Sequence, residues 1–221
     1  MSFCKKYKIL SKLLNFRKDT YEKKIIFLLC LCISFVFAKQ IYIVHGYGSD
    51  ENYGFLPSVA KNLKAKNHGV LLLSFPNAFS PKLDEWMQTM SQNFTKLDEN
   101  TFFITHSLGG VAVLDFLNSL DERTKIGGVI MVAPFDEPLA KLPILNDFIK
   151  PKLDYKKLDN MIIHKIIISA KDDKVVPIWV SENLAKKLNA KFIQTPNGGH
   201  FMESEGFKDL PLVIEELERI K

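Results

Sequence analysis

The sequence predicts an α/β fold in which helices cover both faces of a mostly parallel sheet. From residue 40 onwards, short apolar runs alternate with segments of helical periodicity, a pattern typical of strand–helix–strand units. Several runs are continuously apolar, as expected of parallel strands that are buried on both faces. The 183 residues from 39 to 221 suffice for a single domain with one sizeable core.

The expected elements follow one another in order. The expected strands are residues 40–44, 70–75, 102–104, 127–133, 162–169 and 191–194. The expected helices are residues 55–66, a helix that begins at Pro81, a helix that follows Ser107, and residues 178–188 and 208–220. Four prolines interrupt segment 134–160 among apolar residues. We expect this segment to form either a small lid over an acyl pocket or two short packing helices.

A serine stands where a buried strand meets a helix. Residues 105–110 read Thr-His-Ser-Leu-Gly-Gly, close to the G-x-S-x-G pattern, although Thr105 replaces the first glycine. A sharp strand-to-helix turn exposes the serine hydroxyl to a base that can take its proton. Ser107 is therefore the candidate nucleophile. The alternative interpretation is an ordinary turn that happens to contain a serine.

An acid and a histidine follow in the chain order that this kind of site requires. A mainly apolar strand over residues 165–170 is followed by an acidic loop that contains Asp172 and Asp173. His200 lies in a glycine-rich loop 27 residues after Asp173. We favour Asp173 as the acid because of its spacing to Pro177, with Asp172 as the alternative. The alternative is that both aspartates lie in solvent at the end of a strand and have no catalytic role.

The loop after the first strand is the second candidate part of the site. An oxyanion needs two backbone N–H donors, and we expect them from Leu108, directly after the nucleophile, and from Tyr47. Gly46 and Gly48 let the backbone of that loop turn toward a substrate without their own side chains in the way. We interpret His45 as structural, holding the loop by hydrogen bonds.

Residues 1–38 differ from the rest of the chain. They contain eight Lys or Arg residues and two acidic ones, followed by an uncharged run over residues 25–38. As a helix this run would span about 21 Å, less than the roughly 30 Å of a bilayer core. We expect a signal peptide cleaved after Ala38, and hence export to the periplasm or medium. An uncleaved membrane anchor and a packed helix of a cytoplasmic protein are the alternatives.

Charge and cysteine usage narrow the function of the domain. Without the leader, 22 basic and 23 acidic residues remain, so a nucleic-acid-binding face is not expected. All three cysteines lie in the leader, so the domain has neither disulfides nor a cysteine metal site. We expect no metal and no cofactor.

Several short stretches together carry a family resemblance. They are YIVHGY at 42–47, FPN at 75–77, DEW at 84–86, HSLG at 106–109, AKDDKVVP at 170–177 and GGHF at 198–201 with residues 203–207. In these stretches the chain resembles the YdeN-like serine hydrolases, relatives of retinoblastoma-binding protein nine. The resemblance implies a compact, three-layer α/β-hydrolase fold without the first strands of full-length hydrolases. It also implies the triad Ser107, Asp173 and His200. The leader and Thr105 depart from the family pattern.

The resulting hypothesis is a carboxylesterase-like serine hydrolase. Ser107 would attack an ester-like carbonyl of a small acyl substrate, with His200 as base and Asp173 orienting it. A binding protein that has kept the fold without the chemistry is the alternative from another class, and an acyltransferase is the alternative among enzymes. Ester, thioester and amide substrates all stay open at this point.

Overall fold

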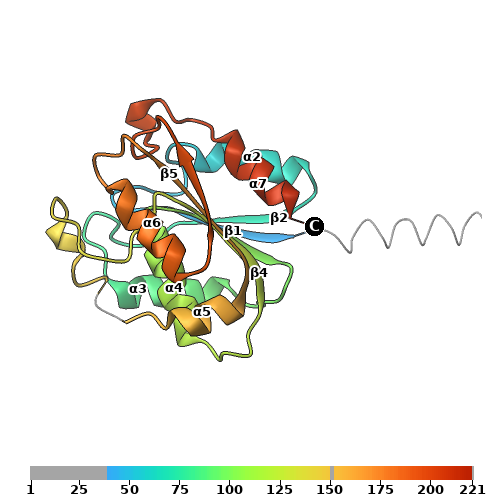
Figure 1. Cartoon of the computed structure of the whole chain (residues 1–221). Helices are drawn as coiled ribbons and strands as arrows, with labels where there is room; N and C mark the ends of the chain where they lie inside the picture. The colour runs from blue at the N-terminus through green and yellow to red at the C-terminus, as the bar shows by residue number, and fades with distance from the viewer. Residues whose placement is uncertain (1–38, 150–151, 221) are drawn as a thin grey trace, which may run out of the picture. The chain divides into compact units, whose positions relative to one another are not determined.

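The centre of the molecule is a parallel sheet (Figure 1). We describe residues 39–149 and 152–220 from a computed structural model. The strands are β1 Gln40–Val44, β2 Gly69–Leu73, β3 Thr101–His106, β4 Ile126–Val132, β5 Ile162–Ala170 and β6 Lys191–Thr195. They lie in the order β2-β1-β3-β4-β5-β6, and each neighbouring pair is parallel. The predicted α/β class is confirmed, and this sheet is parallel throughout rather than mostly parallel.

Helices cover both faces of the sheet. They are α2 Leu56–Ala65, α3 Leu83–Asn93, α4 Leu108–Ser119, α5 Tyr155–Met161, α6 Ile178–Lys187 and α7 Pro211–Arg219, with short 3₁₀ turns at Pro143–Leu145 and Glu203–Glu205. Figure 1 shows α2 and α7 on one face and α3, α4, α5 and α6 on the other. The result is the predicted three-layer arrangement.

The two faces of the sheet carry separate apolar cores because side chains alternate along each strand. On β4, Val129 and Met131 pack with the core under α3 to α6, whereas Ile130 and Val132 pack with the core under α2 and α7. All four side chains are at most 1% exposed. Burial of a side chain of this size contributes about 1.5–3 kcal/mol to stability, so β4 is fixed firmly between its neighbours.

In the described part of segment 134–160, residues Pro143–Leu145 form a 3₁₀ turn and α5 begins at Tyr155. Leu139, Leu145 and Phe148 are buried in the core under α3 to α6. The segment thus packs onto the domain through its apolar residues, and its role as a lid stays a prediction.

Two other predictions concern the start of the last helix and the leader. The last helix begins at Pro211 instead of about residue 208, because proline occupies its first turn and Leu210 before it has non-helical backbone angles (φ −147°, ψ 77°). The predicted leader, residues 1–38, lies outside the described residues. Within the part of the chain that the structure describes, no helix has the length and hydropathy needed to cross a membrane.

The strand order reverses between β1 and β3. The chain passes from β1 outward to β2 and then returns to β3 on the other side of β1. Loops leaving the carboxyl ends of β1 and β3 therefore diverge to opposite faces and leave a crevice at this edge, where ligands of open α/β sheets bind. This edge of the sheet carries the loop after β1 and the turn at Ser107.

Candidate active site

Ser107 occupies the turn between β3 and α4. Its backbone angles, φ 52° and ψ −121°, lie where residues other than glycine are rarely found. Its N–H donates a hydrogen bond of 2.8 Å to the carbonyl of Val132 at the end of β4, which holds the turn against the sheet. The sharp strand-to-helix turn expected at Ser107 is present.

Small residues let α4 pack closely behind this turn. A Cβ on Gly109 would lie 2.5 Å from the carbonyl oxygen of His45, and one on Gly110 would lie 3.1 Å from Cβ of Pro134. The first position of the pattern tolerates Thr105, whose side chain is buried. Its hydroxyl has no hydrogen-bond partner among the described residues. The departure from the pattern therefore leaves an unpaired hydroxyl while the turn itself forms.

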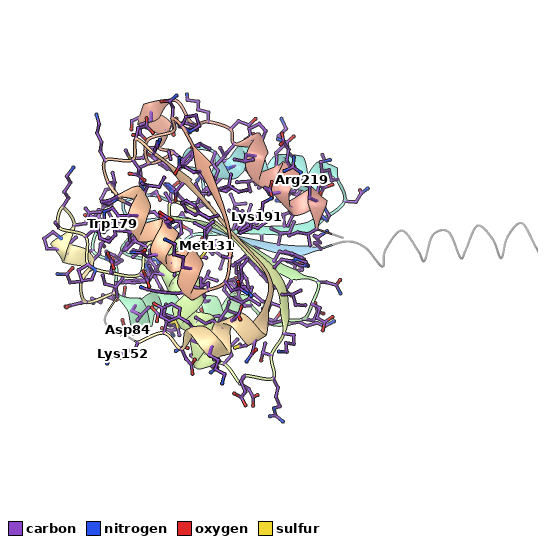
Figure 2. All side chains as sticks on the ribbon, viewed as in Figure 1. Asp84, Met131, Lys152, Trp179, Lys191 and Arg219 are labelled. Atoms are coloured by element: carbon purple, nitrogen blue, oxygen red, sulfur yellow. The ribbon has the colours of Figure 1, made fainter. Side chains whose placement is uncertain are left out.

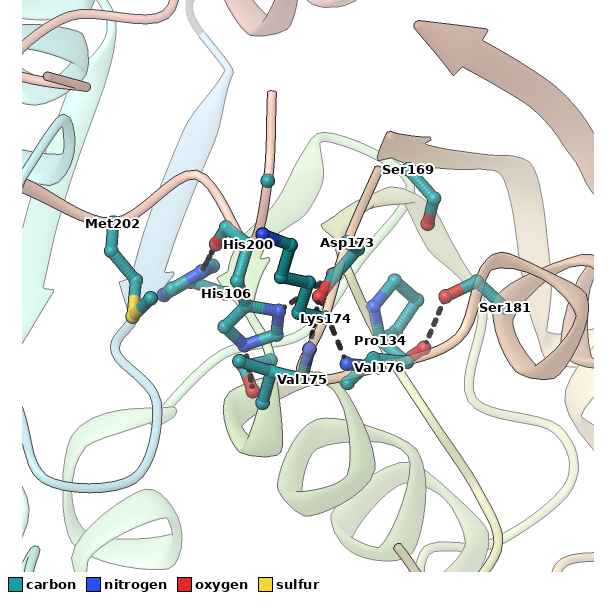
Figure 3. A network of polar contacts seen from close by, with 12 residues as sticks. His106, Pro134, Ser169, Asp173, Lys174, Val175, Val176, Ser181, His200 and Met202 are labelled. Carbon is teal, nitrogen blue, oxygen red and sulfur yellow. Dashed lines mark hydrogen bonds and ion pairs between the residues drawn. The ribbon is translucent and has the colours of Figure 1, made fainter. Parts of the chain in front are cut away.

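The structure brings Ser107, His200 and Asp173 together, and Figure 3 shows the imidazole of His200 beside Asp173. His200 Nε2 lies 2.9 Å from Ser107 Oγ, and His200 Nδ1 lies 2.8 Å from Asp173 Oδ2. The other carboxylate oxygen, Oδ1, accepts the N–H groups of Val175 at 2.7 Å and Val176 at 2.9 Å. The side chains of His200 and Asp173 are 6% and 1% exposed. Because the carboxylate accepts from Nδ1–H, Nε2 is left free to accept the serine proton.

Two further carboxylates hold the loop that carries His200. Asp172, the alternative acid, accepts the N–H of Gly199 at 2.9 Å through Oδ1 and so binds the backbone of this loop. Glu205 Oε2 accepts the N–H of His200 at 2.8 Å and that of Met202 at 3.0 Å. Glu205 lies in stretch 203–207, which is part of the family resemblance, but the sequence did not indicate that its carboxylate holds this loop.

His106 is a second residue whose contribution the sequence did not indicate, although it directly precedes the serine. Its Nε2 lies 2.8 Å from the carbonyl oxygen of His200, and because a carbonyl only accepts, the imidazole donates. Burial, together with the charge of the neighbouring His200, lowers the pKa of His106 to about 3. His106 is therefore neutral near pH 7 and positions the backbone of the histidine loop.

The two predicted oxyanion donors belong to segments next to Ser107, the start of α4 and the loop after β1. The N–H of Leu108 belongs to the first residue of α4, so it has no acceptor within the helix. Tyr47 follows Gly46, on which a Cβ would lie 3.1 Å from Cβ of Ser107. The loop after β1 therefore passes directly beside the serine.

His45 holds this loop by hydrogen bonds and is not part of the hydrogen bonds that join Ser107, His200 and Asp173. Its Nε2 accepts the N–H of Phe75 at 3.0 Å, so the proton lies on Nδ1, which donates to the carbonyl of Gly46 at 2.9 Å. The side chain is buried, and burial lowers its pKa. These contacts agree with the structural interpretation of His45.

A hydroxyl, an imidazole and a carboxylate in this order can perform nucleophilic and general-base chemistry. Over residues 39–149 and 152–220, no three His, Cys, Asp or Glu side chains are grouped so as to hold a metal ion.

Comparisons with known proteins agree with this geometry. A family model described as "Serine hydrolase" matches residues 41–219. The protein YdeN of Bacillus subtilis is 37% identical over 179 residues, which cover 81% of this chain and 94% of YdeN. Its crystal structure has a TM-score of 0.81 to this chain and covers 83% of it and 98% of YdeN.

More distant proteins also match this chain. The serine hydrolase RBBP9 of Rattus norvegicus is 22% identical over 175 residues, covering 78% of this chain and 91% of RBBP9. Est1E of Butyrivibrio proteoclasticus, solved with ferulic acid bound, has a TM-score of 0.60 at 16% identity and covers 82% of this chain and 90% of Est1E. This chain has the compact α/β-hydrolase fold and belongs to the serine hydrolase family that includes YdeN and RBBP9.

Proposed function

We propose that this serine hydrolase cleaves an ester bond of a small acyl substrate through a covalent intermediate on Ser107. The observation that carries the proposal is the continuous series of contacts from Ser107 Oγ to His200 at 2.9 Å and from His200 to Asp173 at 2.8 Å. The fold is shared with Est1E, whose structure contains ferulic acid. An acid of this kind is one product of ester hydrolysis.

In the first step, Ser107 Oγ attacks the ester carbonyl while His200 Nε2 takes its proton. The carbonyl oxygen becomes an oxyanion, which the N–H groups of Leu108 and Tyr47 stabilise. Asp173 stays ionised and stabilises the imidazolium that forms. The imidazolium then donates its proton to the leaving alcohol as the C–O bond breaks, and an acyl-enzyme remains.

In the second step, water enters where the alcohol left. His200 takes a proton from this water, the hydroxide oxygen attacks the acyl carbon, and the returning proton releases Ser107 and a carboxylic acid. The contacts of Asp172, Glu205 and His106 with the histidine loop keep His200 in place through both steps.

Hydrolysis of p-nitrophenyl esters by the full chain tests the proposal. Ser107→Ala should lower kcat about 10⁶-fold, the cost seen when a triad serine is removed. Ser119→Ala, at the other end of the same helix, is the matched control and should retain wild-type activity. A Ser107→Ala enzyme with most of its activity would contradict the assignment.

The same assay separates the alternatives. An added alcohol that is converted to a new ester in preference to water would indicate an acyltransferase. A folded protein that neither cleaves nor transfers any acyl group would favour a binding protein instead.

We also propose that the domain is exported after cleavage behind Ala38, on the basis of the basic and apolar leader. N-terminal sequencing of the protein recovered from its source cells should begin at Lys39. An intact N-terminus in the membrane fraction would indicate an anchor instead.

A further inference from the structure

An apolar pocket of about 240 Å³ lies beside the loop that carries Asp173. We name it the acid-loop pocket. One wall is residues 138–141, which follow β4, and the other is formed by residues between 174 and 180, which follow β5. We propose that this pocket receives the apolar group of the ester and sets the substrate's size, an inference that rests on the proposed function.

The pocket adjoins the loop that positions Asp173, the acid of the triad. Val175 lines the pocket, and its N–H donates at 2.7 Å to Asp173 Oδ1, while Asp173 Oδ2 contacts His200. Figure 3 shows Lys174, Val175 and Val176 extending from Asp173 beside the imidazole of His200. Val175, which holds the carboxylate of Asp173, therefore also forms part of a wall of the pocket.

The second wall is fastened to the first. Lys141 donates a hydrogen bond of 2.8 Å from Nζ to the carbonyl oxygen of Lys174, across the pocket. Leu139 and Val180, at 5% and 2% exposed, are held in the core and form the floor. The buried part of the pocket is therefore fixed by the core, and its rim is exposed.

The lining indicates the chemistry of the occupant. Apart from two lysines, every lining residue is apolar, and no carboxylate is among them. Trp179 lines the pocket with its indole 53% exposed, and a bound apolar group would cover part of that surface. Removal of apolar area from water at about 25 cal/mol per Å² favours such an occupant.

The volume indicates its size. About 240 Å³ is roughly eight times the 30 Å³ that one water occupies in the liquid. A short acyl chain or a single ring fits, and a long fatty chain does not.

A larger pocket of about 700 Å³ is lined by residues at the start of α3 and by residues 144–148, and polar side chains share its lining. Figure 2 shows Trp179 and Asp84, one from each pocket, toward the same end of the molecule, with Lys191 and Arg219 away from them.

The test compares kcat/KM for two series of esters with the full chain. One series varies the acid from acetate through butyrate, hexanoate and octanoate to decanoate on a constant alcohol. The other keeps acetate and varies the alcohol over the same lengths. The wild-type enzyme should prefer short chains in one series and reject decanoate or decanol there. The series with this cutoff identifies which side of the ester enters the pocket.

Two variants should move the cutoff in opposite directions. Trp179→Ala removes an outer wall, so longer chains should be accepted and kcat/KM for the best wild-type ester should fall about tenfold. Ala140→Phe fills the pocket and should shift the preference to acetate. Both residues are exposed, so folding should be unaffected, which unchanged circular dichroism and melting temperature would check. Ile163→Ala, 47% exposed at the start of β5, is the control and should leave both series unchanged.

The outcomes separate the two proposals. An active enzyme whose length preference neither variant shifts, or whose variants slow all esters equally, overturns the pocket assignment alone. A folded wild-type enzyme that cleaves no ester overturns the proposed function, and the pocket assignment falls with it.

Discussion

Two buried polar clusters adjoin α4, and they differ in how completely their charges are satisfied. The Ser107 cluster consists of Ser107, His200 and Asp173, and both carboxylate oxygens of Asp173 accept hydrogen bonds. The second, which we name the Asp136 cluster, consists of Asp115, Asp136, Tyr155 and Lys187. Asp136 Oδ2 accepts from the Tyr155 hydroxyl and from Lys187 Nζ, whereas Oδ1 is buried without a partner among the described residues.

The second cluster also holds a carboxyl group whose ionisation is disfavoured by burial. Asp115 in α4 is 6% exposed, and burial raises its pKa to about 7. The nearby Tyr155 also has a raised pKa, caused by burial and by its hydrogen bond to Asp136. Both carboxylate oxygens of Asp173, which must stay charged for the reaction, thus accept hydrogen bonds. In the Asp136 cluster, by contrast, one carboxylate oxygen of Asp136 has no partner among the described residues, and burial disfavours the ionisation of Asp115.

The difference indicates different tasks. Asp136 and Tyr155 stand near the two ends of segment 134–160, and Lys187 stands at the end of α6. The Asp136 cluster therefore fastens that segment to the domain, while the Ser107 cluster positions reacting atoms. Changes in the first should alter stability and its pH dependence, and changes in the second should alter turnover.

The largest expected effect is that of Asp173→Asn. An amide cannot stabilise the imidazolium and favours the wrong tautomer of His200, so kcat should fall about 10⁴-fold with little change in stability. Asp172→Asn is the matched control, because Asp172 binds only the backbone of Gly199, and it should cost far less. Similar losses in the two variants would show that the acid has been assigned incorrectly.

Asp115→Asn should change how stability depends on pH. Because the folded-state pKa is raised, the folded protein keeps a proton that the unfolded chain releases. Between about pH 4 and pH 7 the wild type should therefore lose up to roughly 1.4 kcal/mol of unfolding free energy per pH unit. The variant lacks this loss, so its advantage should grow up to pH 7 and stay constant above.

Urea unfolding of the wild type and Asp115→Asn at pH 5, 6, 7 and 8 measures this difference. Catalytic activity at pH 7 should stay within a fewfold of wild type. A difference in stability that is independent of pH would contradict the raised pKa.

Asp136→Asn should have the smallest effect of the three. It removes the charge that pairs with Lys187 and should lower the free energy of unfolding by about 1–3 kcal/mol. The exposed pair between Glu182 and Lys186 offers the control, because Glu182→Gln should cost at most about 0.5 kcal/mol. A large loss of kcat in a variant that is still fully folded would place Asp136 in the reaction instead.

The sequence predicted the fold well because each buried strand leaves a local apolar pattern. β4 and β5 are continuously apolar over most of their length, and the prediction of strands at these positions is confirmed. The Ser-Asp-His order could be read in the same way, since the three residues lie in recognisable local motifs.

What the sequence could not show depends on contacts between distant residues. Asp136 contacts Lys187 across 51 positions, and no local pattern joins them. Segment 134–160 gave two interpretations because prolines exclude long helices without fixing where the apolar side chains pack. Likewise, His106 and Glu205 act on the backbone of the histidine loop, and such contacts leave no spacing in the sequence.

The most direct test of the central claim is labelling of the full chain with a fluorophosphonate, followed by peptide mapping. Phosphonylation requires an activated serine and does not depend on knowing the substrate. The account predicts one labelled peptide, containing Ser107, and loss of labelling in both Ser107→Ala and His200→Ala. A folded wild-type protein that stays unlabelled, or label on another serine, would contradict it.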